Sequence, residues 1–177
     1  MENEHVIDVS TTDGGSVLTE LGYDLKVNDT SSLRRSWVIL NDPTCPVRLI
    51  NAGVTTGFAD GQFIFSASGA ALASVAICAV EIRFIAYDVF GDHMKTLSLK
   101  DFSDTASNAR LDLKKLGTWN AWNNEVSELL TVVGFVAKVR TGEGAVWKYR
   151  EGPISDKLTD IHLAVTVGDL SPKKESK

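Results

Sequence analysis

The chain has 177 residues, of which 44% are hydrophobic and 23% charged, and its formal net charge is -5. These values are typical of one globular domain large enough to bury a core without metal or disulfide staples. The acidic balance argues against nucleic-acid binding, because contact with phosphates needs clustered Lys and Arg, and Arg34-Arg35 is too short a cluster. The longest apolar stretch, residues 67–80, is too short and too often interrupted by Ser and Gly to span a membrane.

The two ends of the chain differ from its middle. Residues 1–32 are predicted to be an N-terminal extension in which "HVIDVS" is a candidate strand, residues 33–168 the folded domain, and residues 169–177 a disordered tail. The first residues lack the basic and apolar regions of a signal peptide. We therefore expect a cytoplasmic protein if this N-terminus is native, and an extracytoplasmic one if a signal was removed. The sequon at 28–30 matters only in a secreted chain.

Strand signals become dense from Arg34 onward. Residues 34–40 end at the turn-forming "NDPTCP", and residues 47–58 alternate in polarity up to Asp60-Gly61, a pair suited to a hairpin turn. Residues 63–69 follow as a short strand. The segment therefore predicts successive strands joined by tight turns.

Residues 80–102 give the clearest pattern in the chain. Val80, Ile82, Phe84 and Ala86 share one face of a predicted strand, and a period of two marks a half-buried strand. "FGDH" interrupts the alternation, which resumes over residues 94–102. The passage predicts a β-hairpin.

The rest of the chain contains one irregular segment and a second clear strand pair. Residues 103–127 are least strand-like, with a candidate helical turn at 111–116, and are expected to cross between sheets or to cover an edge. Residues 129–149 predict a second hairpin with its turn at 142–144. Its inward-facing set is predicted to be Val133, Phe135, Ala137 and Val139. Residues 160–167 are either a last edge strand or a tail that docks on the sheet.

About seven or eight strands with little helix predict an all-β fold. We expect an antiparallel immunoglobulin-like β-sandwich, with a jelly roll or another β-barrel as the alternative. The stretch "RFIAYDVFG", which includes Phe84, Tyr87, Asp88 and Gly91, resembles the signature of FxLYD-type domains over about a dozen residues. That resemblance implies a small bacterial immunoglobulin-like sandwich, in a family whose members mostly have no assigned role.

Cysteine and histidine are sparse. Cys45 and Cys78 occur in no Cys-x-x-Cys pattern, so we interpret them as reduced, buried thiols, although a bridge between facing strands remains open in an oxidising compartment. The three histidines have no zinc-site spacing, and no phosphate loop, dinucleotide fingerprint or nucleophile elbow occurs. We therefore predict neither a cofactor nor a metal.

Asp88, Asp92 and His93 are the candidate polar cluster. Two carboxylates and an imidazole could perform acid–base chemistry or hold a cation. A hairpin turn, however, selects Asp and Gly for backbone reasons alone, and neighbouring strand residues point to opposite faces. We interpret the three residues as parts of a turn.

"GTWNAWNNE" places tryptophans among asparagines in the least strand-like region. Trp119, Asn120, Trp122 and Asn123 are the candidate ligand-binding residues, because an indole ring gives a large contact area and an amide supplies hydrogen bonds. The other interpretation is that the two rings close the open end of a sandwich.

The sequence therefore predicts a non-catalytic sandwich that binds another protein or a further copy of itself through exposed sheet edges. A carbohydrate- or small-ligand-binding module built on the Trp and Asn residues is the alternative. A hydrolase or metal-dependent enzyme at Asp88, Asp92 and His93 is the third and least favoured class.

Overall fold

Two β-sheets pack face to face in the computed structural model, which describes residues 7–11, 36–113 and 116–173. Sheet A has the strand order β1 (Ile7–Thr11), β2 (Ser36–Leu40), β9 (Leu129–Thr141), β5 (Ile77–Asp88) and β6 (His93–Asp101), and β10 (Val146–Lys148) also pairs with β9. Sheet B contains β3 (Val47–Ala59) and β4 (Gln62–Ala73), with β7 (Arg110–Asp112) and β8 (Thr118–Ala121) both paired to β4.

The fold is the predicted all-β sandwich. Among the described strands every pair is antiparallel except one: β2 runs parallel to β9, with Ser36 opposite Thr131 and Leu40 opposite Phe135. The predicted hairpins over residues 80–102 and 129–149 are present as β5–β6 and β9–β10.

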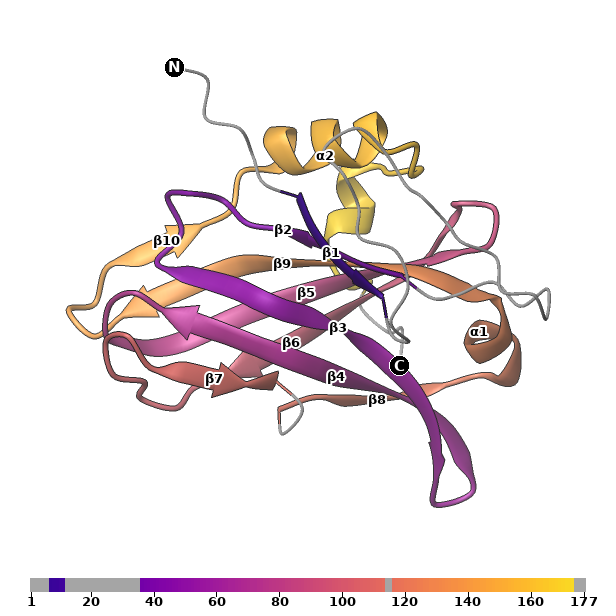
Figure 1. Ribbon diagram of the computed structural model, residues 1–177, viewed down its shortest axis with the longest axis horizontal. Coiled ribbons are helices and arrows are strands. Elements are labelled where there is room, and N and C mark those ends of the chain that lie inside the picture. The colour runs from indigo at the N-terminus through magenta and orange to yellow at the C-terminus, as the bar shows by residue number, and fades with distance from the viewer. Residues whose placement is uncertain (1–6, 12–35, 114–115, 174–177) are drawn as a thin grey trace.

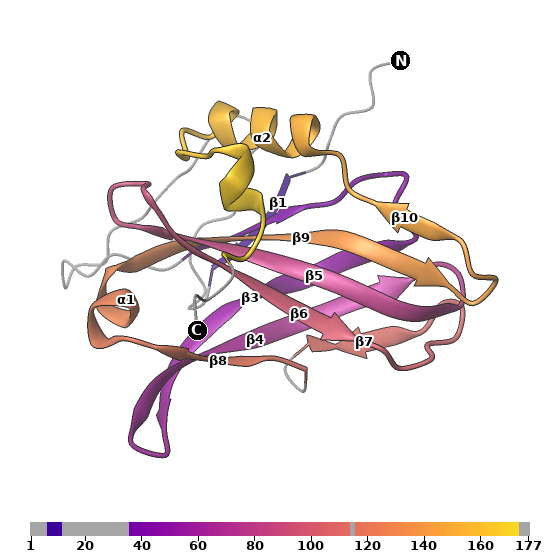
Figure 2. The ribbon, with the colours of Figure 1, turned by 180° about the vertical axis from the view of Figure 1, so that it is seen from behind.

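A third layer lies on the outer face of sheet A (Figures 1 and 2). Helix α2 (Glu151–Asp160) and the 3₁₀ helix η2 (Val167–Leu170) cover that face, and Ile154 and Leu158 of α2 are buried on it. The main core fills the space between the two sheets and includes Phe84 and Phe65. The centre of sheet A is therefore buried on both faces, which explains why most of β5 and β9 is continuously buried.

The two-residue period in β5 is correct, but the strand is not half-buried. Val80, Ile82, Phe84 and Ala86 share the inter-sheet core as predicted, whereas Ile85 and Tyr87 lie in the second core beneath α2.

The inward set predicted for β9 does not share one face, and of its four residues only Val139 faces inward between the sheets as predicted. Val133, Phe135 and Ala137 face α2, whereas Val139 faces the other sheet. The ladder shifts register here, with Glu81 opposite Lys138 but Ile82 opposite Val136, and an extra residue in one strand reverses the faces beyond it.

Strands β3 and β4 form a long hairpin whose tip extends beyond the sandwich (Figure 1). Asp60 and Gly61 both adopt positive φ, 51° and 77°, as a two-residue hairpin turn requires. Strand β4 continues to Ala73, so the strand predicted at 63–69 is longer than expected.

Residues 103–127 link sheet A to sheet B and back, as expected. They supply β7 and β8, which cover an edge of β4, and helix α1 (Asn123–Glu128). The helical turn predicted at 111–116 is confirmed only in its second part: Leu111 and Asp112 end β7, a 3₁₀ turn begins at Leu113, and the Leu116 N–H donates to the Leu113 carbonyl.

The C-terminal part differs most from expectation. Helix α2 was not predicted, and residues 161–166 form no strand but dock on the sheet through Leu163. Leu170 is fully buried, so the packed part extends beyond residue 168, where a tail was expected to begin. The sequon at 28–30 and residues 174–177 lie outside the described residues. In the described ranges, no helix is long and apolar enough to cross a membrane.

Candidate functional site

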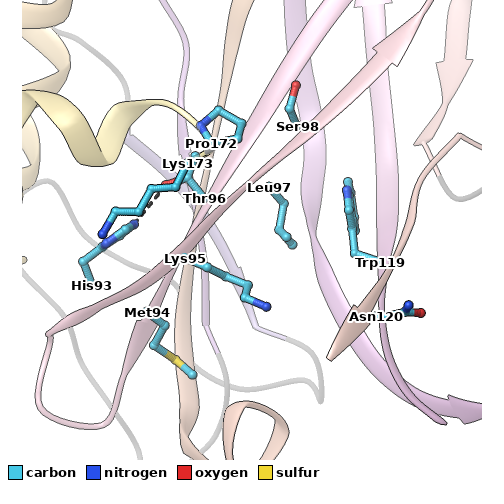
Figure 3. Close-up of a pocket in the computed structure, with 10 residues that line it drawn as sticks. All are labelled: His93, Met94, Lys95, Thr96, Leu97, Ser98, Trp119, Asn120, Pro172 and Lys173. Atoms are coloured by element: carbon cyan, nitrogen blue, oxygen red, sulfur yellow. Dashed lines mark hydrogen bonds between the residues drawn. The ribbon is translucent and has the colours of Figure 1, made fainter. Parts of the chain in front are cut away.

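The sandwich is open along one side, between the edge of sheet A at β6 and the edge of sheet B at β8. A cavity of about 480 Å³ lies there (Figure 3). Six consecutive residues of β6, His93–Ser98, line it, together with Trp119 and Asn120 of β8 and Pro172 and Lys173 of the C-terminal segment. We call this cavity the edge groove.

Strand β6 is the last strand of sheet A and pairs only with β5. In an antiparallel pair, alternate residues direct their N–H and C=O groups away from the partner strand. Among the described residues, no main-chain hydrogen bond joins Met94–Leu99 to anything other than β5. Along the edge groove, β6 therefore has a row of main-chain donors and acceptors without a main-chain partner among the described residues.

One wall of the groove is built by the inter-sheet core. Trp119 is half-buried and packs edge-on against Phe84, with ring centroids 6.2 Å apart. Lys95 points between the sheets, with its Nζ 5.7 Å from the centroid of the Phe65 ring and 2.6 Å from Oε1 of Glu125 in α1. The Lys95 charge is therefore paired on this wall.

The other wall is the C-terminal segment, attached to β6 through His93. Its Nδ1 lies 3.2 Å from Oδ1 of Asp169 and its Nε2 lies 3.0 Å from Oγ1 of Thr96, whose hydroxyl donates to the Asp169 carbonyl. Burial lowers the pKa of His93 below its ordinary value, with Lys173 acting in the same direction and Asp169 opposing it.

A second cavity of about 620 Å³ adjoins the first, and Lys95 and Asn120 border both. Phe63, Trp122 and Asn123 also line it. Trp122 is 74% exposed because it stands between the end of β8 and the start of α1, where its N–H donates to Oε2 of Glu125 at 2.8 Å. We call this cavity the aromatic pocket.

The four predicted ligand-binding residues are therefore distributed over these two adjoining cavities. Trp119 and Asn120 line the edge groove, and Asn120, Trp122 and Asn123 line the aromatic pocket. Sequence reasoning missed Lys95 and Phe63, which lie on other strands and reach the site only through sheet packing.

Asp88, Asp92 and His93 do not form one chemical cluster. Oδ1 of Asp88 accepts the N–H groups of Phe90 and Asp92 at 2.8 and 2.9 Å, so this carboxylate holds the hairpin turn together. The imidazole of His93 contacts Asp169 and Thr96. The described ranges contain no group of three or more His, Cys, Asp or Glu residues placed to hold a metal ion.

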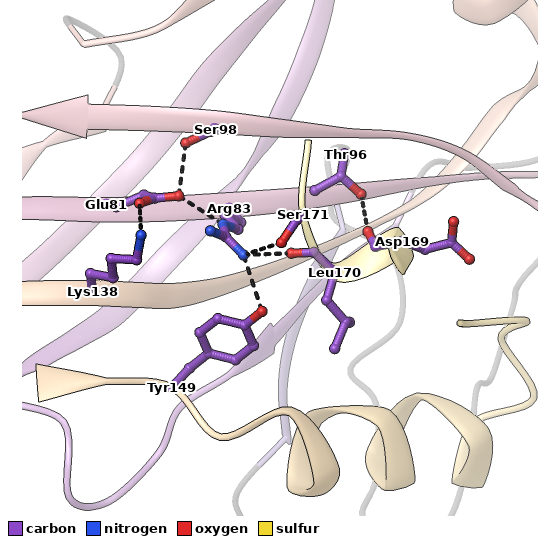
Figure 4. Close-up of polar contacts among 9 residues, drawn as sticks. All are labelled: Glu81, Arg83, Thr96, Ser98, Lys138, Tyr149, Asp169, Leu170 and Ser171. Carbon is purple, nitrogen blue, oxygen red and sulfur yellow. Dashed lines mark hydrogen bonds and ion pairs between the residues drawn. The ribbon is translucent and has the colours of Figure 1, made fainter. Parts of the chain in front are cut away.

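Buried charges also lie on the outer face of sheet A (Figure 4). Arg83 donates from Nε to Oε1 of Glu81 at 2.7 Å, and its Nη1 reaches the Leu170 carbonyl at 2.8 Å, Ser171 Oγ at 2.9 Å and Tyr149 Oη at 3.1 Å. Burial raises the pKa of Glu81, but Arg83, Lys138 and Lys100 outweigh that effect and hold it below its ordinary value of 4.5. This network fastens the C-terminal segment to the sheet.

The two cysteines are both free and half-buried. Burial raises the pKa of the Cys45 thiol to about 12, so little thiolate forms at neutral pH. Cys45 is therefore unsuited to act as a nucleophile.

Comparison with known proteins adds little to this description. No protein-family model and no curated protein sequence matches the chain. A solved structure, a hypothetical protein from Peptoclostridium difficile 630, is similar to it with 9% sequence identity and a TM-score of 0.47, over 68% of this chain and 93% of that one. At this level the similarity carries no conclusion about function.

Proposed function

We propose that the protein is a non-catalytic interaction module that binds an extended segment of another polypeptide along the free edge of β6. The observation that carries this proposal is the edge groove, which follows six consecutive residues along the free edge of β6. An added strand would gain affinity from main-chain hydrogen bonds and selectivity from pockets for alternate side chains.

The walls of the groove suit such a segment. A strand added to β6 would lie between the ring of Trp119 on one side and Pro172 and Lys173 on the other. Of the titratable residues that line the groove, Lys95 and His93 are already paired with Glu125 and Asp169, whereas Lys173 is exposed and forms no ion pair with a described residue. Acidic residues in the bound segment would therefore be favoured, and binding would weaken with added salt.

Selection from a library of random twelve-residue peptides tests the proposal. We expect selected peptides to alternate in polarity and to be acidic, and saturation with one of them to slow amide exchange at alternate positions of Met94–Ser98. Binding should fall in Lys173→Glu and remain in Lys148→Glu, a matched charge reversal on β10. Peptides that protect no amide of β6 would contradict the proposal.

A second copy of the chain could offer its own β6 as the added strand. Sedimentation over a range of protein concentrations would then show a dimer that a selected peptide dissociates. A monomer at all concentrations would assign the groove to a different polypeptide.

The second candidate function is carbohydrate binding in the aromatic pocket. It is favoured by the 74% exposure of Trp122 next to the amide groups of Asn120 and Asn123. Sugar rings stack on exposed aromatic faces while amides bond to hydroxyl groups. Titration with a glycan panel should then change tryptophan fluorescence in the wild-type protein and in Trp147→Phe, but not in Trp122→Ala.

Membership of the FxLYD-type, immunoglobulin-like class is likewise a proposal. It rests on the stretch from Arg83 to Gly91, in which Ala86 stands where the signature has Leu. A sequence family built outward from this chain tests it: the proposal requires Tyr87 and Asp88 to persist among relatives that retain the β5–β6 hairpin.

A further inference from the structure

The third layer leaves one end of sheet A uncovered. Along the outer face of β5, Tyr87 and Ile85 lie beneath α2, and Arg83 lies beneath Tyr149 and the segment that follows η2. Beyond Arg83 the next residues on that face are Glu81 and Ala79. A cavity of about 290 Å³ opens over them.

Basic side chains from two neighbouring strands surround this cavity. Lys138 and Lys100 stand opposite Glu81 on β9 and β6, and Arg140 stands opposite Ala79. All three basic residues line the cavity, and Glu81 is the only acidic residue among its described lining residues.

Both oxygens of the Glu81 carboxylate already have partners. Its Oε1 accepts from Arg83 Nε at 2.7 Å and from Ser98 Oγ at 3.2 Å, and its Oε2 lies 3.4 Å from Lys138 Nζ (Figure 4). Neither Lys100 nor Arg140 forms an ion pair with a described residue. In a chain of net charge -5, this cavity therefore has an uncompensated positive charge.

Apolar side chains stand beside these cations. Phe102, just after β6, is 76% exposed and Val146 of β10 is 53% exposed, and both line the cavity with Ala79. An exposed aromatic ring next to an unpaired Arg and Lys is the chemistry that receives an anion carrying an apolar group.

We propose that this cavity is a binding site for small amphipathic carboxylates, in which Arg140 and Lys100 hold the carboxylate while Phe102 and Val146 cover the alkyl or aryl part. The guanidinium group of Arg140 can bind a carboxylate in bidentate fashion, and Lys100 adds a compact positive charge. Glu81 in the floor limits the negative charge that the cavity accepts, so a monoanion binds in preference to a phosphate dianion.

Titration calorimetry with four probes tests the site: octanoate, its neutral analogue octanamide, acetate and inorganic phosphate. Octanoate should bind at least tenfold more tightly than each of the others, because only octanoate satisfies both the charge and the apolar requirement. If octanamide bound as tightly as octanoate, charge would have no role and the proposal would be overturned. If acetate or phosphate bound as tightly as octanoate, the apolar contacts would have no role, which would overturn it as well.

Variants locate the site. Lys100→Gln combined with Arg140→Gln should weaken octanoate binding at least tenfold, whereas Arg48→Gln combined with Arg110→Gln, which removes two exposed charges from sheet B, should leave it unchanged. Phe102→Ser, a surface change, should weaken binding about fivefold through lost apolar contact. Octanoate binding that survives in the Lys100/Arg140 variant would overturn the proposal, and so would equal losses in both double variants.

Discussion

The two long sides of the sandwich differ in whether a tryptophan ring fills the gap between the sheets. Trp37 and Trp122 show the contrast. Trp37 of β2 is buried between the sheets, where its Nε1 donates to the Val54 carbonyl of β3 at 3.2 Å. The ring fits because Gly53 opposite it has no side chain: a Cβ there would lie 2.1 Å from Cδ2 of Trp37. On the β6–β8 side Trp119 is only half-buried against Phe84, and Trp122 faces solvent.

The difference teaches that residue type alone does not decide whether a tryptophan closes a core or borders a site. A ring is buried where the facing strand leaves space and offers an acceptor for its N–H group. Where the facing edge is open, as at β6, the same residue becomes part of a cavity wall. The side closed by Trp37 should therefore govern stability, and the open side should govern binding.

The largest expected effect is on the closed side. Trp37→Ala should lower the free energy of unfolding by about 4 kcal/mol, because it removes a buried ring and leaves a cavity. Chemical denaturation followed by circular dichroism measures the change. A loss below about 1 kcal/mol would contradict the view that this ring closes the sandwich.

Arg83 tests how firmly the C-terminal wall of the edge groove is attached. Arg83→Met should cost about 3 kcal/mol, since it leaves the Glu81 carboxylate buried without its closest partner. The double variant with Glu81→Gln should recover part of the loss, and denaturation curves compare the two. No difference between the single and double variants would refute the ion-pair explanation.

Gly53 of β3, which packs against the Trp37 ring, tests the closed side from the facing strand. Gly53→Ala should destabilise by about 2 kcal/mol, because the added methyl group collides with a rigid indole. Gly57→Ala is the matched control on the same strand, since its Cβ would lie 3.5 Å from the nearest atom, in ordinary contact. Thermal unfolding of both variants should show a clear loss only in the first.

The pH dependence of stability should reveal His93 in the groove wall. Because the folded state lowers its pKa below the ordinary 6.5, the unfolded state binds more protons near pH 6. The free energy of unfolding should therefore be highest above about pH 7 and should fall as the pH decreases below that value. A further loss is expected near pH 4, where Glu81 and Asp169, whose pKa values are also lowered, become protonated. In His93→Gln the decline near neutral pH should disappear, while the acid step remains.

The smallest expected effect is on the open side. Trp122→Ala should change the free energy of unfolding by less than about 0.5 kcal/mol, because the ring is mostly in solvent. A loss as large as that of Trp37→Ala would mean that both sides are closed by tryptophan. The same denaturation assay decides between these outcomes.

The strands and hairpins could be predicted from the sequence because their signals are local. The alternation in β5 and the Asp60-Gly61 turn depend only on residues next to each other in the chain. The third layer could not be predicted in the same way, since Arg83 looks like a solvent-facing residue until Leu170 and Ser171 are seen to cover it. A signal for α2 did exist: Ile154, Leu158 and Ile161 follow a helical spacing, with Pro153 in the first turn.

The candidate site was predictable only in part for the same reason. Trp119, Asn120, Trp122 and Asn123 are close together in sequence, and their composition alone draws attention to them. Lys95 and Phe63 reach the same cavities through the meeting of two sheet edges, and Asp169 meets His93 across 76 positions of the chain. Contacts between residues so far apart in the chain depend on the strand order of the two sheets, which cannot be deduced from a single sequence.

The parallel pairing of β2 with β9 has a consequence for how the chain acquires its structure. Thr131 lies 95 positions after Ser36, its partner, so β2 emerges from the ribosome long before the strand that it needs. The β3–β4 and β5–β6 hairpins can assemble during that interval, whereas β2 must wait until β9 is synthesised. A nascent chain stopped before residue 129 would therefore hold β2 without its parallel partner β9, and chaperone binding during synthesis should concentrate on that strand.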